Sequence, residues 1–392
     1  MAKKLPQMTK RKRIGLSYSY NENWIGGTYY IENLINALNT LDEVLKPHLV
    51  LIINKRSDYK AAKNNLSYPY MSFRLGTGET NFAARFANKI TNRLLRKTFF
   101  NQTIKKLEAV FPYYKSKPQS LATNKIYWIA DFQEHFSPEF FSAEAIEGRK
   151  RNQMEIQGSS EHLILSSQNA AGHFKSLYPE HSVNVHVLPF AVTHPAYRNL
   201  TIGPLLKKFD LPDVYFLCPN QFWKHKNQLT VIQAVHRLKN DGTNITVAFT
   251  GNTADLRNPE YFIELNIYVQ QNNLTDNIRF LGFIKREEQL QLMNNAVAIV
   301  QPSLFEGWST VVEDAKSMNK ALIVSDIEVH QEQLVDSSAR FFAPLNVKDL
   351  AAKLELAISA HPLPSLYANP DYQRNIKNFG NGFLRIALQE TA

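Results

Sequence analysis

The sequence has a single cysteine, Cys218, among its 392 residues. One cysteine excludes an internal disulfide and any zinc site built from several thiolates, and it fits a reducing cytosol. No apolar run reaches the roughly 20 residues that a membrane-spanning helix needs. Residues 1–13 are basic but lack the apolar core of a signal peptide. These absences predict a cytoplasmic location.

Motifs of several common enzyme classes are also missing. There is no G-x-x-x-x-G-K-[ST] phosphate loop, no G-x-S-x-G nucleophile elbow and no visible two-histidine metal ligand set. The sequence therefore predicts no metal and no cofactor.

Acidic residues are too few to balance the basic ones, and the net charge of +10 implies anionic partners. No zinc-finger spacing or ordered basic module indicates nucleic acid, so nucleic acid is not an expected partner. Small anionic substrates and anionic lipid are the alternatives. Much of the excess lies between residues 81 and 117, where Glu108 is the single acid among the following basic residues: Arg85, Lys89, Arg93, Arg96, Lys97, Lys105, Lys106, Lys115 and Lys117.

Apolar residues interleave with these charges at helical spacing, which predicts a basic amphipathic helix over residues 82–109. Its apolar face either covers a sheet, with the basic face in water, or residues 82–108 contact an anionic membrane. Both can hold at once. A peripheral position at the inner face of the membrane is the corresponding expectation.

Apolar β-type runs alternate with amphipathic segments along the whole chain, which predicts an α/β protein with parallel sheets. The proline-rich segment 189–212 marks a boundary between two Rossmann-like domains, residues 1–200 and 201–370. A helix over residues 372–389 is expected to cross back to the first domain, although Gly380 and Gly382 weaken it. Strands are expected at residues 13–20, 48–54, 125–129, 162–166, 184–188, 214–218, 246–250, 278–281, 297–300 and 321–325. Helices are expected at residues 29–41, 82–109, 168–178, 227–238, 259–271, 286–295, 310–318, 330–335 and 347–359.

The most informative segment is the strand, loop and helix over residues 297–318. The loop carries Glu306 and Gly307, and the helix begins at Ser309 or Thr310 and carries Asp314. A helix N-terminus at the carboxyl end of a parallel strand binds anions. Two carboxylates on either side of such a site suit a ligand with phosphate in the middle and hydroxyls at both ends. A nucleotide-sugar has that form.

This segment resembles the signature of the retaining glycosyltransferases of family four, the group 1 transferases, which have the GT-B fold. Their signature is an acid-glycine-aromatic loop, a helix and a second Glu eight positions after the first acid. Glu306, Gly307 and Trp308 match it, but the eighth position here is the shorter Asp314, with Glu313 just before it. The resemblance implies that Glu306 holds donor-sugar hydroxyls and that Asp314, or the neighbouring Glu313, holds the ribose. The amides of Gly307, Trp308, Ser309 and Thr310 would face the diphosphate.

Further loops of the second domain fit the same resemblance. In the family, the loop after the first strand of this domain carries an Arg and a Lys that face the diphosphate. Lys226 matches the Lys, but Gln221 occupies the Arg position, and a neutral amide cannot replace a guanidinium. Lys224 or His225 would compensate. Gly251 ends the next strand, and Gly282 ends the one after it. Taken alone, each loop reads as an ordinary strand-to-helix turn. The family uses the second loop to cover the nucleotide base, so the resemblance implies that Phe283 and Ile284 contact the base.

In the first domain, Gly26 and Gly27 follow the first strand, where the family has a glycine-rich loop facing the donor phosphate. The alternative is a loop that needs positive φ. The family often has a histidine near the donor sugar, and His135 is the candidate, with Glu134 as its alternative. His330 and Glu332 are interpreted as structural.

The sequence thus predicts a retaining, metal-independent glycosyltransferase that uses a nucleotide-diphosphate sugar and a glycan or lipid-linked saccharide acceptor, as in polysaccharide biosynthesis. The absence of Asp-x-Asp argues against the metal-dependent GT-A transferases. Glu306, Lys226 and His135 are the expected catalytic residues. Two alternatives stay open: a GT-B nucleotide-sugar epimerase, and a non-catalytic nucleotide-sugar-binding or membrane-attached subunit.

Overall fold

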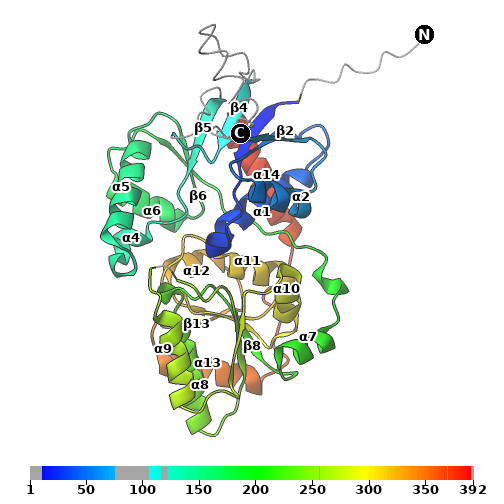
Figure 1. Ribbon diagram of the computed structural model, residues 1–392, viewed down its shortest axis with the longest axis vertical. Coiled ribbons are helices and arrows are strands. Elements are labelled where there is room, and N and C mark those ends of the chain that lie inside the picture. Colours follow the sequence, from blue (N-terminus) through cyan, green and yellow to red (C-terminus); the bar gives the residue numbers. More distant parts are fainter. Residues whose placement is uncertain (1–10, 76–105, 116–121, 256, 369, 390–392) are drawn as a thin grey trace, which may run out of the picture.

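A computed structural model describes residues 11–75, 106–115, 122–255, 257–368 and 370–389. The chain forms two lobes, one above the other in Figure 1, and each contains a sheet. Among the described residues, one sheet has the order β3-β2-β1-β4-β5-β6-β7 and the other β10-β9-β8-β11-β12-β13. Every neighbouring pair of strands is parallel. The predicted α/β class with parallel sheets is confirmed.

The strands of the first sheet are β1 Arg13–Ser17, β2 His48–Ile53, β3 Met71–Leu75, β4 Leu107–Phe111, β5 Ala122–Trp128, β6 His162–Leu165 and β7 Asn184–Val187. Those of the second are β8 Phe216–Pro219, β9 Val247–Thr250, β10 Ile278–Gly282, β11 Ile299–Gln301, β12 Leu322–Ser325 and β13 Arg340–Phe342. The helices are α1 Ile25–Asn39, α2 Arg56–Asn65, α4 Gln133–Phe136, α5 Ala143–Gln157, α6 Gln168–Leu177, α7 Ile202–Phe209, α8 Gln228–Asn240, α9 Tyr261–Gln271, α10 Arg286–Asn295, α11 Thr310–Met318, α12 Glu328–Gln333, α13 Val347–Ser359 and α14 Tyr372–Leu388.

The central strands are buried on both faces, as expected for parallel sheets covered by helices on each side. Five of the six residues of β2 are buried, and all four of β9 are. Their continuous apolar runs are what made these strands recognisable in the sequence. The edge strands β3 and β13 were missed because they are short and only partly apolar.

The helix predicted for residues 82–109 is wrong at its end. Leu107–Phe111 form strand β4, which pairs with β1 and β5 in the middle of the first sheet. Glu108 lies on this strand, and its carboxylate accepts a hydrogen bond from the backbone amide of Arg13. Pairing on both sides outweighs the helical spacing of the sequence here. Residues 82–105 of the predicted amphipathic helix lie outside the described residues, and so does most of the proposed membrane contact.

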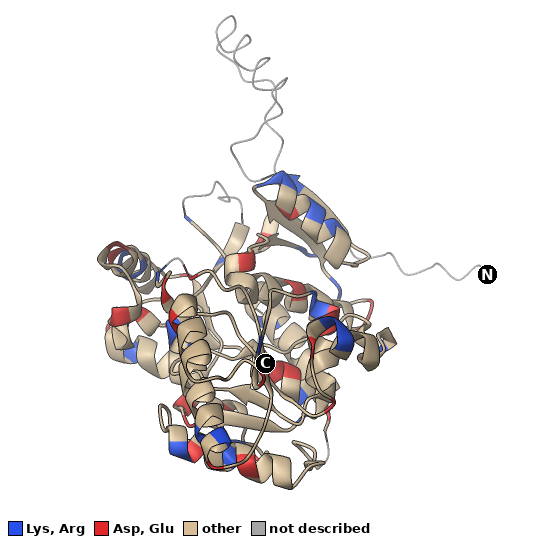
Figure 2. Cartoon of the chain, turned by 60° about the horizontal axis from the view of Figure 1, so that its bottom comes forward, with Lys and Arg blue, Asp and Glu red and all other residues tan. Residues whose placement is uncertain are grey.

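In the described part of the chain, basic residues recur on several helices and are interleaved with acidic ones (Figure 2). None of the helices described is both long and apolar enough to cross a membrane.

Helix α14 returns to the first lobe and packs against α1, β4 and β5 (Figure 1). Phe379 and Phe383 on this helix are buried in the core of that lobe. Gly380 is the point of closest approach, because a Cβ added there would lie 3.0 Å from the carbonyl oxygen of Ala37. The helix forms despite Gly380 and Gly382, and Gly380 lets it approach α1 closely.

Replacing Gly380 with alanine is expected to lower the free energy of unfolding by about 1–3 kcal/mol, since the added methyl group meets backbone rather than a flexible side chain. Gly148→Ala is the matched control: this glycine is also inside a helix, α5, but nothing lies within 4 Å of an added Cβ. Without a clash, alanine there should stabilise the helix by about 0.5–1 kcal/mol. Urea unfolding of the two variants checks both signs, and a stabilised Gly380→Ala would contradict the close approach.

Candidate active site

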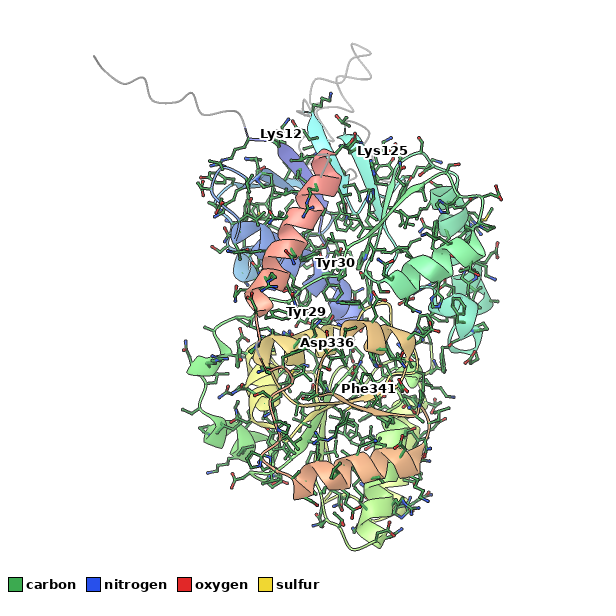
Figure 3. All side chains as sticks on the ribbon, turned by 180° about the vertical axis from the view of Figure 1, so that it is seen from behind. Lys12, Tyr29, Tyr30, Lys125, Asp336 and Phe341 are labelled. Atoms are coloured by element: carbon green, nitrogen blue, oxygen red, sulfur yellow. The ribbon has the colours of Figure 1, made fainter. Side chains whose placement is uncertain are left out.

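A cavity of about 490 Å³ lies between the two lobes. It is lined by residues that follow β1 and β5 in the first sheet and β8, β9, β10 and β11 in the second, so the carboxyl ends of both sheets face it. Figure 3 labels Tyr29 and Tyr30 on α1, where the upper lobe meets the lower one. Ligands of parallel α/β sheets bind at these ends.

Glu306 lines the cavity, and one of its carboxylate oxygens is held from two sides. Lys226 Nζ lies 2.6 Å from Oε1, and Gln301 Nε2 lies 2.8 Å from the same atom. Gln301 is completely buried, and its own Oε1 accepts a hydrogen bond from Asn220. Oε2 of Glu306 has no partner among the described residues. The carboxylate is therefore fixed in position while one oxygen remains available to a ligand.

Asp314 lines the same cavity and is held in a similar way. Its Oδ1 is paired with Arg286 on α10 and lies 2.9 Å from Nε2 of His194, a residue of the segment between the lobes. Burial raises the pKa of Asp314, but Arg286 and His194 outweigh it and keep the pKa below its usual value. Oδ2 has no partner in the described part of the chain. Asp314 is thus an ionised, oriented carboxylate.

Glu313, the other candidate for the ribose, does not line the cavity. Its carboxylate faces α12 and α14, where it accepts hydrogen bonds from Lys316, Gln333 and Tyr372 at 2.6–2.9 Å. Successive residues on a helix point about 100° apart, so only one of the two acids can face the cavity. The structure brings Asp314 there and leaves Glu313 as a buried bridge between helices.

The N-terminus of α11 faces the cavity through Gly307, Trp308, Ser309 and Thr310, all of which line it. Ser309 caps the helix by accepting a hydrogen bond from the amide of Val312, and its own amide donates to Gln333 Oε1 at 3.1 Å. The Ser309 amide is therefore not free for a ligand, contrary to the sequence interpretation. The amides of Gly307, Trp308 and Thr310 have no partner among the described residues.

The structure places the predicted phosphate-binding residues of the loop after β8 in different surroundings. Gln221 lines the cavity, but its side chain bridges the lobes: Nε2 donates to the carbonyl of Glu22 and Oε1 accepts from the amide of Asn252. Lys224 is exposed and does not line the cavity. His225 does line it, but burial and the nearby charges of Lys226, Arg257 and Arg149 hold its pKa well below the usual value. Neither Lys224 nor His225 supplies the charge that Gln221 lacks.

The other two loops of the second lobe reach the cavity as predicted from their strands. Gly251 has a φ of +143°, and a Cβ there would lie 2.2 Å from the carbonyl oxygen of Asn220. Only glycine fits this position. Phe283 and Ile284 also line the cavity, and Phe283 exposes 44 % of its surface.

Gly26 and Gly27 line the cavity from inside the first turn of α1, which begins four residues before the predicted start. Neither glycine has a positive φ. Gly27 makes room for Trp24, whose ring lies 2.6 Å from the position of an added Cβ. Trp24 stacks on Trp128 and Trp128 on Tyr30, with ring centroids 5.6 and 4.3 Å apart. These three rings form an aromatic wall of the cavity.

The structure does not bring His135 into the cavity. His135 is hydrogen-bonded to Gln153 at 2.7 Å, and the alternative Glu134 is buried against Arg149. Asp131 and Gln133 of the same segment line the cavity instead. The prediction chose a residue too far beyond the end of β5, because the short helix α4 turns the side chain of His135 away from the cavity.

Sequence reasoning missed several residues of the cavity. Among the described residues, three arginines line it, and each comes from a different element: Arg149 from α5, Arg257 from the loop after β9 and Arg286 from α10. Polar atoms of Tyr30, Gln133 and His225 are buried along it without a partner among the described residues. Buried polar atoms are normally paired, so these indicate a polar ligand or water. Gln301, which holds Glu306, was also missed. Its signal in the sequence is that it is a polar residue at the end of an apolar strand.

Glu332 and His330, interpreted from the sequence as structural residues, do have structural contacts. Glu332 contacts the first lobe, and His330 lies in the core. The carboxylate of Glu332 accepts hydrogen bonds from the amides of Gln168 and Asn169 at 2.8 and 2.9 Å, which satisfies the first turn of α6 across the lobes. His330 is buried, and its Nδ1 lies 2.9 Å from the carbonyl oxygen of Ser325.

The two lobes approach each other closely at Gly307, where an added Cβ would lie 1.9 Å from the carbonyl oxygen of Ala130. Gly307→Ala should therefore leave each lobe folded but prevent this closed arrangement. Turnover should fall by about 10²-fold, the cost of a misplacement of about 1 Å. The measurement is the turnover rate together with the radius of gyration by X-ray scattering; Gly203→Ala, with nothing near its Cβ position, is the control. Wild-type turnover by Gly307→Ala would contradict the contact.

Comparisons with known proteins agree with this architecture. Residues 207–374 match the family model described as glycosyl transferases group 1. A segment of 124 residues is 31% identical to the O-antigen chain mannosyltransferase RfbU of Salmonella typhimurium, covering 32% of this chain and 33% of that protein. The chain thus spans about a third of this relative.

Solved structures resemble the whole chain. Sucrose-phosphate synthase from Thermosynechococcus elongatus has a TM-score of 0.62 at 14% identity, with 97% of both chains covered. Anabaena HepE in complex with UDP and glucose has a TM-score of 0.60 at 14% identity, covering 97% of this chain and 95% of that one. At this identity the likeness concerns the fold, and the predicted GT-B fold is confirmed.

Proposed function

We propose that this protein transfers a sugar from a nucleotide-diphosphate sugar to a saccharide hydroxyl, because residues 207–374 match the group 1 glycosyltransferase model and the whole chain has the GT-B fold. One observation carries the proposal. Glu306 and Asp314 line one cavity beside the N-terminus of α11, and each has one oxygen held by a cation and the other without a partner among the described residues.

The distribution of groups matches the parts of such a donor. Asp314 Oδ2 accepts a hydrogen bond from the ribose, and Phe283 and Ile284 pack against the base. The unpaired amides of Gly307, Trp308 and Thr310 bind the diphosphate with Lys226. Glu306 Oε2 accepts hydrogen bonds from hydroxyls of the sugar.

The same placement favours the transition state. When the bond between C1 of the sugar and the phosphate oxygen breaks, negative charge builds on the diphosphate and positive charge on the ring. Fixed amides and Lys226 stabilise the former without reorganising. We propose that the acceptor oxygen bonds to C1 on the same face while its proton passes to the departing phosphate oxygen, which retains the configuration and requires no metal. Contact between the lobes excludes water.

The relatives also support a donor class and an acceptor class. The names of an O-antigen chain mannosyltransferase and of a complex with UDP and glucose support a hexose donor and a polysaccharide or lipid-linked acceptor. A cytoplasmic location, peripheral at the membrane, is part of the same proposal.

A panel of UDP-, GDP-, ADP- and dTDP-hexoses tests the proposal, because at a given concentration a ligand that binds more tightly raises the unfolding temperature more. At least one donor should stabilise the protein, and free nucleoside diphosphate should then be released faster when a saccharide acceptor is added. Stabilisation by none of them would overturn the proposal. Conversion of the donor to another nucleotide-sugar without release of nucleoside diphosphate would indicate an epimerase, and stabilisation without any turnover would indicate a binding subunit.

A further inference from the structure

The cavity lacks a guanidinium at residue 221, but Arg257 presents one from another loop. Arg257 lies in the loop after β9 and lines the cavity together with Gln221 and Lys226. Its guanidinium carbon lies 4.8 Å from the ring centroid of Trp223 in its own lobe and 5.0 Å from that of Phe141 in the other lobe. Two aromatic rings, one from each lobe, thus contact this guanidinium.

One edge of the guanidinium is anchored to its own loop. Nε donates to Oδ1 of Asp255 at 3.3 Å, and the backbone amide of Arg257 donates to the same oxygen at 3.0 Å. Asp255 is almost fully buried, so this anchor is fixed. The two Nη groups have no partner among the residues that the structure describes. A guanidinium held in this way presents two parallel donors, which match two oxygens of a phosphate.

The other described cations of the cavity contact carboxylates through their terminal nitrogens, whereas Arg257 contacts Asp255 through Nε and leaves both Nη groups unpaired. Lys226 pairs with Glu306, Arg286 with Asp314, and Arg149 with Glu134 at 3.1 Å. Arg257 lies beside the loop after β8: its guanidinium contacts Trp223, whose ring centroid is 5.6 Å from that of His225, the residue before Lys226. Arg257 is therefore on the side of the cavity where this loop carries Lys226, the partner of Glu306.

We propose that Arg257 binds the sugar-linked phosphate of the donor and supplies the positive charge that Gln221 does not. This inference rests on the proposed function, because it assigns one phosphate of the same ligand. Gln221 is then free to bridge Glu22 and Asn252 across the lobes, and the phosphate contact has moved to the neighbouring loop. Since Phe141 belongs to the first lobe, full ordering of Arg257 requires that the lobes be together.

Calorimetric titration with nucleoside diphosphate and with the corresponding monophosphate tests this assignment. The probes are UDP, GDP, ADP and dTDP, and the pair with the base that wild type prefers is then used for the variants. Arg257→Gln should weaken diphosphate binding by about 10- to 100-fold, the range of a hydrogen bond to a charged group. The monophosphate lacks the phosphate that Arg257 would bind, so its dissociation constant should change by less than about 3-fold. That change is smaller than the tenfold that corresponds to about 1.4 kcal/mol. Arg257→Lys, which keeps the charge without the paired donors, should lie between wild type and Arg257→Gln.

Arg237→Gln is the matched control, because it removes one guanidinium from the exposed surface of α8 without touching the cavity. Its affinities should equal those of wild type. Unchanged diphosphate binding by a folded Arg257→Gln variant overturns the inference and leaves the proposed function standing. Loss of transfer with diphosphate affinity retained also overturns it, because the guanidinium then serves the acceptor. If wild type itself binds none of the four diphosphates, the proposed function fails and the inference fails with it.

Discussion

Replacing Glu306 with glutamine is expected to lower the rate of sugar transfer by about 10²–10³-fold, the range for removing one preorganised electrostatic contact. The substitution keeps the shape of the side chain and an oxygen that can still accept from Lys226 and Gln301. It changes the atom that faces the cavity from an acceptor into a donor. The positive charge that develops on the sugar ring then loses the nearby negative charge of the carboxylate.

The measurement is the rate of nucleoside diphosphate release with the donor that stabilises wild type best. Glu264→Gln on the exposed face of α9 is the control, since it makes the same chemical change far from the cavity. The unfolding temperature of both variants shows whether the fold is retained. Turnover by Glu306→Gln at the rate of wild type would mean that the sugar does not lie beside this loop.

The second lobe could be predicted from the sequence because its site is mostly local. Glu306, Gly307 and Asp314 lie on one strand-loop-helix segment, and a parallel sheet brings the loops after β8, β9 and β10 to the same edge. The order of residues along the chain therefore determines much of the geometry. The ends of α10, α11 and α13 were predicted to the residue.

The partners of these residues could not be predicted, because distant elements supply them. His194 comes from the segment between the lobes, and Arg286 from the preceding helix, yet both meet at one oxygen of Asp314. Glu313 differs from Asp314 by a single position, and only the contacts of α12 and α14 decide which acid faces the cavity. The spacing of residues in the sequence determines which of them share a face of a helix. It does not determine which face the rest of the protein covers and which face lines the cavity.

The first lobe was harder to predict for a related reason. The apolar residues of β4 follow a basic segment with helical spacing, and pairing with β1 and β5 determines their conformation. Asp131, Gln133 and Arg149 line the cavity from the loop after β5, from α4 and from α5, with no shared motif. A strand end indicates which loop reaches the cavity, but a short helix such as α4 then decides which side chain turns toward it.

Replacing Asp314 with asparagine is expected to lower the free energy of unfolding by about 3–5 kcal/mol, the cost of removing one partner of a buried ion pair. Asp314 is 1 % exposed and paired with Arg286, so the variant leaves a mostly buried guanidinium without its counter-charge. Urea unfolding near pH 7 measures the loss. Asp213→Asn, at an exposed position, should change the stability by less than about 0.5 kcal/mol.

The pH dependence distinguishes an ion pair from simple packing. The pKa of Asp314 is lowered in the folded protein, so the pair stabilises the fold above the pKa of an unfolded aspartate, about 3.9. This stabilisation is lost as the pH falls through the lower, folded-state pKa. The difference between wild type and Asp314→Asn should therefore shrink when unfolding is repeated below about pH 3.9.

A double variant separates the pair from its parts. Adding Arg286→Gln to Asp314→Asn removes the stranded charge, so the double variant should lose less stability than the sum of the two single variants by about 1 kcal/mol or more. Additive losses would mean that the two side chains act independently, and the ion pair would then not be what fixes Asp314 at the cavity. Coupled losses would mean that α10 holds the acid in place, with its second oxygen left to a ligand.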